Sequence, residues 1–281
     1  MDKPVDMVFN NAGLVKKYAE FRPVPPRSLV NTVVDYVKEK VEPLQVCVDI
    51  GCGSGQNTRL YSEHFKQVIG LDVSLEQLRV AEQDHLHQNV VYKEGLAEHM
   101  PVENASVDLV TSCAAVHWFN LDTFYKEVDR VLRPGGVLAC YSYLACTPLY
   151  AGKNLRSTIL EMHSNLDPNW SMGHRHLNSD YGTLPAFSPE EVFISSNEEK
   201  FVVETDATLD SIIGYLSSWS AVQKLQDREG EEVVSQFLSK CKHRLQDEMG
   251  TTEEDAPMRS RYTYFLRMWR KPSAHVIPGS S

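Results

Sequence analysis

Short apolar runs alternate with amphipathic stretches between residues 45 and 142. Strands that are apolar along their whole length and alternate with helices are typical of a parallel sheet covered on both faces. The sequence therefore predicts an α/β fold built on a doubly wound sheet. The expected strands lie at 44–50, 66–73, 89–95, 106–113 and 135–143, and the expected helices between them at 56–65, 74–85 and 121–132.

The pattern changes on both sides of this region. Residues 147–190 are rich in Asn, His, Ser, Pro, Gly and aromatic residues, which favours an irregular insertion over the sheet. The remaining expected elements are a helix at 25–41 that begins at two prolines, one helix in the insertion at 153–165, a strand at 199–206, helices at 209–225 and 231–249, and an antiparallel strand at 261–271.

This organisation predicts one domain, residues 1–271, followed by a tail at 272–281. We divide the domain into an N-terminal cover with the first helix (1–44), a cofactor-binding core (45–146), a substrate and lid insertion (147–190) and a C-terminal part of the sheet with its helices (191–271).

Composition narrows the classes of partner. Hydrophobic residues make up 42% and charged residues 23% of the 281 residues, as in soluble proteins with a real core. The net charge of −10 opposes nucleic acid and an anionic membrane, so we expect neither as a partner. There is no apolar stretch of the ~20 residues that a membrane helix needs. Without a signal segment or a CxxC pair, the sequence predicts a reduced cytoplasmic protein, a monomer or weak dimer, without a metal.

The first expected strand leads directly into "VDIGCGSGQNT". Gly51, Gly53 and Gly55 leave the backbone bare at the carboxyl end of that strand, where doubly wound sheets bind their ligands. Their spacing is G-x-G-x-G, because Gln56 stands where the G-x-G-x-x-G of a dinucleotide site would continue. The bare backbone therefore predicts a nucleotide-like ligand other than a dinucleotide.

Two carboxylates refine this ligand. Asp49 stands two residues before the first glycine, where it would repel a pyrophosphate and suit an ammonium group. Asp72 closes the second expected strand, where a carboxylate accepts hydrogen bonds from ribose hydroxyls. A ligand with a ribose and an ammonium group but no phosphate is implied, and S-adenosylmethionine fits that description.

At these motifs the chain resembles the class I S-adenosylmethionine-dependent methyltransferases, over residues 9–142 and the final strand. "VDIGCGSG" resembles their first motif, "GLDVS" their acidic ribose motif and "VLRPGGVL" the turn into their fifth strand. "YAEFRPVPP", "LAEHMPVENASVDLV", "AAVHWFN" and "GYLSSWSA" are similar to the trans-aconitate methyltransferase-like group of small-molecule enzymes. The resemblance implies a Rossmann-like, seven-stranded, mostly parallel sheet whose last strand is antiparallel.

The resemblance also implies roles at the cofactor. Asp49 would hold its amino group through the turn or a water, Asp72 would bind the ribose and Val73 would pack on the adenine. Many relatives carry an Asp where this chain has Leu96, so adenine recognition would rest on the backbone around Ala97 and Glu98. The other expected cofactor residues are Gly51, Cys52, Gly53 and Gly55 along the methionine part, Cys113 and Ala114 beneath the sulfonium, and Tyr18 and Arg22 in the cover.

The acceptor side is less sharply defined. His117 follows the fourth strand and either orients or deprotonates the acceptor, or belongs to a packed aromatic corner. Trp118 and Phe119 would form an aromatic wall beside the sulfonium. Tyr143, Trp219 and Arg175 are further candidates, the last as a clamp for a carboxylate. The histidines of the insertion, His163, His174 and His176, match no metal-ligand spacing.

The sequence thus predicts an enzyme that transfers the methyl group of S-adenosylmethionine to a small soluble acceptor. A carboxylate is the favoured acceptor, because it is ionised at pH 7 and needs no general base. Two alternatives remain open: a regulatory protein that binds S-adenosylmethionine without catalysis, and, less favoured, an NAD-dependent oxidoreductase.

Overall fold

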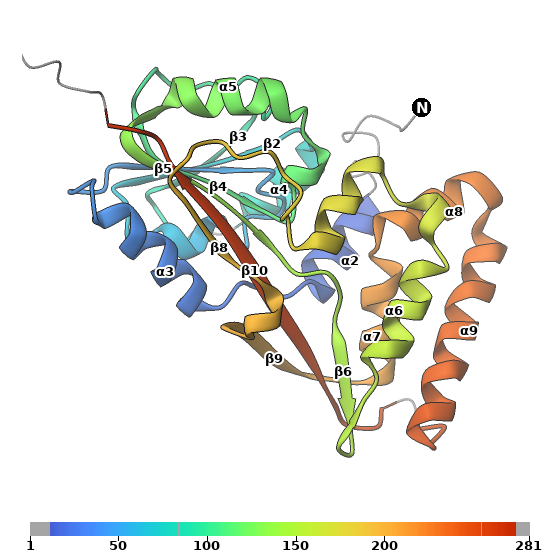
Figure 1. The fold of residues 1–281 in the computed structure, drawn as a ribbon. Coiled ribbons are helices and arrows are strands. Elements are labelled where there is room, and N and C mark those ends of the chain that lie inside the picture. The colour runs from blue at the N-terminus through green and yellow to red at the C-terminus, as the bar shows by residue number, and fades with distance from the viewer. Residues whose placement is uncertain (1–11, 84, 254, 274–281) are drawn as a thin grey trace, which may run out of the picture.

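A ten-stranded sheet runs through the molecule in the order β3-β2-β1-β4-β5-β10-β6-β7, with β8 and β9 also paired to β10 (Figure 1). The computed structural model describes residues 12–83, 85–253 and 255–273, without the side chains of Ala12, Tyr18 and Ala19. The strands are β1 Val46–Ile50, β2 Gln67–Asp72, β3 Val90–Glu94, β4 Val107–Cys113, β5 Leu132–Ser142, β6 Thr147–Tyr150, β7 Lys153–Asn154, β8 Glu191–Ile194, β9 Phe201–Ala207 and β10 Met258–Arg270.

The long strand β10 explains how ten strands form a seven-position sheet. Its residues 265–270 pair antiparallel with β5 and its residues 266–269 with β8. Its residues 258–264 pair with β9, and 259–261 pair with β6. Strands β8 and β9 thus share one position, β6 continues the position of β5, and β7 adds a short hairpin to β6. The predicted seven-stranded sheet with an antiparallel last strand is confirmed, because β1 to β5 are parallel to one another and β10 is antiparallel to β5.

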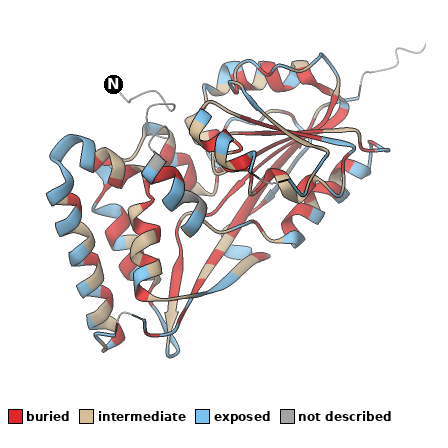
Figure 2. Ribbon diagram, turned by 180° about the vertical axis from the view of Figure 1, so that it is seen from behind, coloured by how far each residue is buried: buried red, intermediate tan, exposed pale blue. Residues whose placement is uncertain are grey.

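Alternate residues of the central strands point into two hydrophobic cores. In β5, Val137, Ala139 and Tyr141 belong to the core beneath α3, whereas Leu138 and Cys140 belong to the core beneath α5. The two helices therefore cover opposite faces of the sheet, and its central strands are buried (Figures 1 and 2). A strand buried on both faces has no polar side to alternate with, which is why the apolar runs of the sequence are continuous.

The helices follow the predictions in part. They are α2 Ala12–Phe21, α3 Arg27–Lys38, α4 Leu75–Ala81, α5 Leu121–Val131, α6 Arg156–Ser164, α7 Leu209–Ser217, α8 Ser220–Glu229 and α9 Glu231–Met249, with the 3-10 helices η1 Thr58–Tyr61, η2 Val116–Trp118, η3 Asp167–Asn169, η4 Met172–Ser179 and η5 Ser196–Glu198. The helix expected over residues 56–65 is wrong, since only η1 forms there. The helix expected over 209–225 is broken at Ser218 and Trp219, where Trp219 is extended and buried.

The insertion is more regular than its composition suggested. Its first residues form β6 and β7 rather than a loop, and α6 is confirmed as its helix. Helices α6 to α9 gather beyond one end of the sheet, and α2 lies between them and the sheet (Figure 1). The molecule therefore has a sheet half and a helical half, and helix α2 of the N-terminal cover lies at their boundary.

Candidate active site

The glycine loop leaves β1 and is held on the end of β2. The N–H groups of Gly51 and Cys52 both donate to the carbonyl oxygen of Leu71, at 2.8 and 3.0 Å. Gly51, Gly53 and Gly55 have φ angles of +69°, +52° and +79°, a region that side chains resist. The loop conformation therefore favours glycine at all three positions.

Neighbouring side chains also leave no room for a Cβ atom at two of the three glycines. A Cβ atom at Gly51 would lie 2.4 Å from the Cβ of Ala115, and one at Gly55 would lie 2.3 Å from the hydroxyl of Tyr92. At Gly53 a Cβ would meet only the side chain of Gln77, at ordinary contact distances of 3.7 Å and above. Gly53 is therefore the position whose open side faces a cavity rather than packed protein, and Gly55 does not line that cavity.

Asp49 lies beneath the loop and is fully buried. Its Oδ1 accepts hydrogen bonds from Asn57 Nδ2 at 2.8 Å and Thr111 Oγ1 at 2.9 Å, and its Oδ2 accepts one from Thr58 Oγ1 at 2.6 Å. Burial raises the pKa of this carboxyl to about 6, and the three donors lower it less. The side chain does not reach the cavity, so its influence on a ligand passes through the turn.

Asp72 ends β2 and does reach the cavity. Its Oδ2 accepts the N–H of Gly53 and its Oδ1 accepts the N–H of Ser74, both at 2.8 Å. Burial raises the pKa of this carboxyl, and these backbone donors oppose the shift. A carboxylate oxygen can accept more than one hydrogen bond, so both oxygens keep capacity for the hydroxyls of a ribose.

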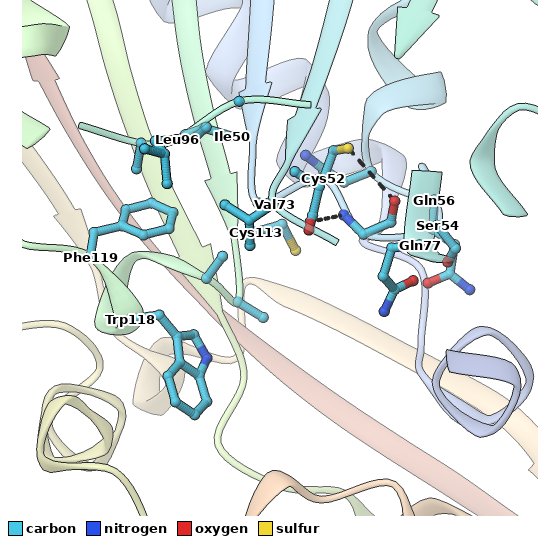
Figure 3. A pocket seen from close by; sticks show the side chains of 18 of the residues that line it. Ile50, Cys52, Ser54, Gln56, Val73, Gln77, Leu96, Cys113, Trp118 and Phe119 are labelled. Carbon is cyan, nitrogen blue, oxygen red and sulfur yellow. Dashed lines mark hydrogen bonds between the residues drawn. The ribbon is translucent and has the colours of Figure 1, made fainter. Parts of the chain in front are cut away.

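The cavity between these elements has a volume of about 680 Å³, within the range of roughly 300–1,000 Å³ for cofactor sites. Figure 3 shows its side chains converging from the loop after β1, from the residue after β2, from the end of β4 and from the end of η2. Most of the expected cofactor residues line it: Arg22, Gly51, Cys52, Gly53, Asp72, Val73, Ala97, Glu98, Cys113 and Ala114. The side chain of Tyr18 lies outside the described part of the structure.

Gln77 is a cavity residue that sequence reasoning missed. Its N–H donates to Ser74 Oγ at 3.3 Å, which caps α4. Its side chain is buried in the wall of the cavity, and Oε1 has no hydrogen-bond partner among the described residues. Its position in the first turn of α4, directly after the acidic motif, was the available signal.

The far end of the cavity lies between the loop after β3 and η2. Leu96, which stands where many relatives have Asp, is 55% exposed at the rim. Ala97 is buried, and Glu98 Oε1 accepts the N–H of Asn120 at 2.8 Å. This end therefore presents an apolar side chain and backbone, together with Phe119 on its other side (Figure 3).

The end of β4 turns sharply into the cavity. Ala114 has a φ angle of +56°, which is uncommon for a residue with a side chain and is frequent at functional sites. Its N–H donates to the carbonyl oxygen of Tyr141 at 2.9 Å, which fixes the turn. Cys113 and Trp118 flank it along the cavity wall (Figure 3).

A second, smaller cavity of about 60 Å³ adjoins the first. Four residues line both cavities: Arg22, Ala114, Trp118 and Tyr143. The insertion and the helical half contribute Trp170, His174, Leu177 and Trp219 among others, and the sheet half contributes His117, Ser142 and Leu144. Of the expected acceptor residues, Trp118 and Tyr143 thus lie at the junction, Phe119 in the first cavity and Trp219 in the second.

Arg22 stands at the junction of the two cavities. Its Nε donates to Ser218 Oγ at 3.0 Å, its Nη2 to the carbonyl oxygen of Ser218 at 3.0 Å, and its Nη1 to the hydroxyl of Tyr143 at 3.2 Å. Its positive charge lowers the pKa values of His117 and His174. Because it lines both cavities, Arg22 lies on the acceptor side as well as beside the cofactor cavity.

His117 lines the smaller cavity and does not line the larger one. Its Nδ1 is hydrogen-bonded to the hydroxyl of Tyr181 at 3.1 Å, and its ring meets that of Trp118 at a centroid distance of 5.5 Å. Burial lowers its pKa to about 3, and the nearby His176 and Arg22 lower it further. These contacts are those of a packed aromatic corner, although the partner is a tyrosine and not the backbone.

The histidines of the insertion form an aromatic cluster. His163 and His174 share a hydrogen bond between their Nε2 atoms at 2.8 Å, and Trp170 stacks on His174 with ring centroids 3.9 Å apart. Burial lowers the pKa of His174 to about 2. In the described part of the chain, no three His, Cys, Asp or Glu residues are placed to hold a metal ion.

Arg175 lines neither of the two cavities. It is exposed in a separate groove that it shares with Met172 and His176 on the outer side of η2. The structure therefore does not bring this expected carboxylate clamp to the junction, where Arg22 stands instead. The reason is that η4 buries His174 and His176 and turns Arg175, which lies between them, outward.

Comparisons with known proteins agree with this geometry. A family model described as a methyltransferase domain matches residues 48–140. A protein of Dictyostelium discoideum described as a methyltransferase is 30% identical over 247 residues, which cover 86% of this chain and 87% of that protein. A malonyl-[acyl-carrier protein] O-methyltransferase of Pectobacterium atrosepticum is 38% identical over 97 residues, 34% of this chain and 37% of the relative.

A solved structure from Anaeromyxobacter dehalogenans, described as a type II methyltransferase, has 30% sequence identity and a TM-score of 0.70, and the match covers 90% of this chain and 99% of that one. The chain belongs to the class I S-adenosylmethionine-dependent methyltransferases, and S-adenosylmethionine is its cofactor. The NAD-dependent alternative is thereby excluded. The described helices include none that is long and apolar enough to cross a membrane.

Proposed function

We propose that the protein transfers the methyl group of S-adenosylmethionine to a carboxylate oxygen of a small acceptor. The observation that carries this proposal is the position of Arg22, a cation at the junction of the cofactor cavity and the smaller cavity. An acceptor in the smaller cavity would have its reacting end at this junction. A guanidinium there favours an acceptor that is already an anion.

The residues of the larger cavity fit the cofactor. Asp72 would accept the ribose hydroxyls, and the bare backbone at Gly53 leaves room for the methionine part. The buried Oε1 of Gln77, which has no partner among the described residues, is a further acceptor beside this position. When bound, S-adenosylmethionine supplies an electron-poor methyl group to an attacking atom.

The neighbouring histidines support an acceptor that needs no base. With pKa values of about 3 and about 2, His117 and His174 remain neutral at pH 7 and are weak proton acceptors. A phenol, an alcohol or an ammonium group would have to lose a proton before or during the transfer. A carboxylic acid has already lost its proton at pH 7.

The protein then contributes alignment and exclusion of water. Arg22 and Tyr143 would orient the carboxylate, and Trp118 would border both the cofactor and the acceptor. Holding two reactants in line accounts for a large part of the acceleration of such bimolecular reactions. The Pectobacterium relative, which is an O-methyltransferase of a malonyl group, supports an acid as the acceptor.

Kinetics of Arg22 variants test this proposal. With a panel of small carboxylic acids, Arg22→Gln should raise the KM for the acid at least tenfold, and Arg22→Lys should restore part of the loss, because the charge returns without the planar fork. The affinity for S-adenosylhomocysteine, measured by calorimetry, should change much less. If Arg22→Gln weakens S-adenosylhomocysteine binding and leaves the KM unchanged, Arg22 holds the cofactor and the proposal loses its main support.

A further inference from the structure

The last residue of α2 lies on a bare patch of α7. The ring of Phe21 is so close to Gly214 that a Cβ atom there would lie 2.5 to 2.8 Å from three of its carbons. Helices α2 and α7 pack against each other in the boundary between the two halves of the molecule (Figure 1). No side chain larger than hydrogen fits at position 214 while the ring keeps this place.

Glycine inside a helix needs a reason, because every residue except proline is a better helix former. Gly214 is in the middle of α7, Leu209–Ser217, and its φ angle is not in the left-handed region. The backbone conformation therefore does not require glycine at this position. The ring of Phe21 supplies the reason.

The next residue, Arg22, binds the end of the same helix. Its two hydrogen bonds to Ser218 place the guanidinium at the C-terminal end of α7, where a helix attracts positive charge. The guanidinium carbon also lies 5.2 Å from the ring centroid of Tyr215. Helix α7 thus holds two consecutive residues of the cover. Phe21 packs against Gly214, and the guanidinium of Arg22 binds the C-terminal end of the helix.

This attachment determines where the cavity wall stands. Arg22, Pro23 and Pro25 all line the larger cavity. Beyond Arg22 the cover is also held by Tyr264, whose hydroxyl donates to the carbonyl oxygen of Pro23 at 3.2 Å. If Phe21 were displaced from α7, the guanidinium of Arg22 would move away from Ser218. The junction between the two cavities would then lose its positive charge.

We propose that Gly214 is a positioning residue for methyl transfer: its missing side chain lets Phe21 dock the N-terminal cover on α7, and this docking places Arg22 at the junction. The docking itself is independent of the acceptor, whereas its effect on acceptor binding rests on the proposed function. The two parts therefore need separate measurements.

The docking is tested by hydrogen exchange of residues 12–22 in protein saturated with S-adenosylhomocysteine. Gly214→Ala should speed exchange there at least tenfold, and so should Phe21→Ala. In the Phe21→Ala background, Gly214→Ala should have no further effect, because the ring it collides with is gone. Ser217→Ala is the matched control: it removes a hydroxyl that bonds the Gly214 carbonyl oxygen within the same helix, and it should leave exchange in the cover unchanged.

Unchanged exchange in Gly214→Ala, or additive effects of the two substitutions, would overturn the docking. If Gly214→Ala does not fold, the exchange of Phe21→Ala tests the docking alone. Unchanged exchange in Phe21→Ala would also overturn the docking. The second measurement is the KM for a carboxylic acid, which Gly214→Ala should raise at least fivefold while Ser217→Ala leaves it unchanged. If the wild-type protein methylates no acid, the proposed function fails and the exchange experiment still judges the docking.

Discussion

Single residues of the loop and of β2 have separable roles in holding the cofactor. Asp72 is the clearest case, since both of its oxygens are fixed by backbone N–H groups and the residue lines the cavity. Hydrogen bonds from ribose hydroxyls to a carboxylate contribute about 1.5–3 kcal/mol each. Asp72→Ala should therefore weaken S-adenosylhomocysteine binding at least tenfold by calorimetry. Asp35→Ala, which removes the same charge from the exposed face of α3, should not.

The glycines of the loop should respond differently to the same substitution. Gly53→Ala places a methyl group toward the cavity, so it should mainly lower cofactor affinity, with a loss of stability of about 1 kcal/mol from its positive φ. Gly55→Ala drives a methyl group into Tyr92 and should lower the melting temperature more. Calorimetry and thermal unfolding of both variants separate the effects, and equal profiles would show that Gly53 is merely a turn residue.

Asp49 should make stability depend on pH. Its pKa of about 6 in the folded protein exceeds the ordinary value of 3.8, so the folded state binds the proton more tightly than the unfolded state. The contribution to the free energy of unfolding is therefore full below about pH 4 and is lost as the pH rises to about 6, in total about 3 kcal/mol.

Urea unfolding of the wild type and of Asp49→Asn checks this sign, because the variant cannot titrate at this position. The free energy of unfolding of the wild type minus that of Asp49→Asn should fall as the pH rises through this window and stay level above it. A difference that rises with pH would mean that the carboxyl is stabilised as an anion.

At the scale of elements, the covering segments should respond to the ligand. The cover supplies Arg22, Pro23 and Pro25 to the cavity wall, and the insertion supplies Trp170 and His174 to the smaller cavity. Amides of residues 12–25 and 150–185 should gain protection from hydrogen exchange when S-adenosylhomocysteine is added, more than those of α9, which lines neither cavity. Equal gains in α9 would indicate a general stabilisation, and no gain would indicate a preformed cavity.

The elements also show what the sequence could and could not predict. Strands β1 to β5, β9 and β10 could be predicted because their apolar or alternating runs stand next to stretches with helical periodicity. Strands β6 and β8 have four residues each, too few for a period, and form because β10 pairs with them. The helix expected over 56–65 fails because Asn57 and Thr58 turn their side chains toward Asp49.

The candidate site also has a part that the sequence could predict and a part that it could not. The loop glycines and Asp72 belong to local motifs and could be placed from their order along the chain. The smaller cavity is assembled from Arg22, Tyr143, His174 and Trp219, which lie far apart in the sequence and meet only through packing. No spacing rule could therefore separate Arg22 from Arg175 as the cation beside the acceptor.

At the scale of the whole molecule, two halves meet at the reaction site. The sheet half carries the cofactor residues, and the helical half with the insertion contributes Trp170, His174 and Trp219 to the smaller cavity, so the cover at their boundary touches both. The net charge of −10 disfavours anions over most of the surface. A cation placed at the junction provides local attraction for a small acid in an otherwise acidic protein.

The most direct test of this account is the fate of a labelled methyl group. Purified protein is incubated with S-adenosylmethionine that carries a trideuteromethyl group and with a panel of small carboxylic acids, and products are identified by mass spectrometry. We predict one S-adenosylhomocysteine for each labelled methyl ester formed, and release of the label as methanol on alkaline hydrolysis. Label on a nitrogen, a carbon or a hydroxyl oxygen would contradict the carboxylate assignment, and S-adenosylmethionine binding without turnover of any acceptor would identify a regulatory protein instead of an enzyme.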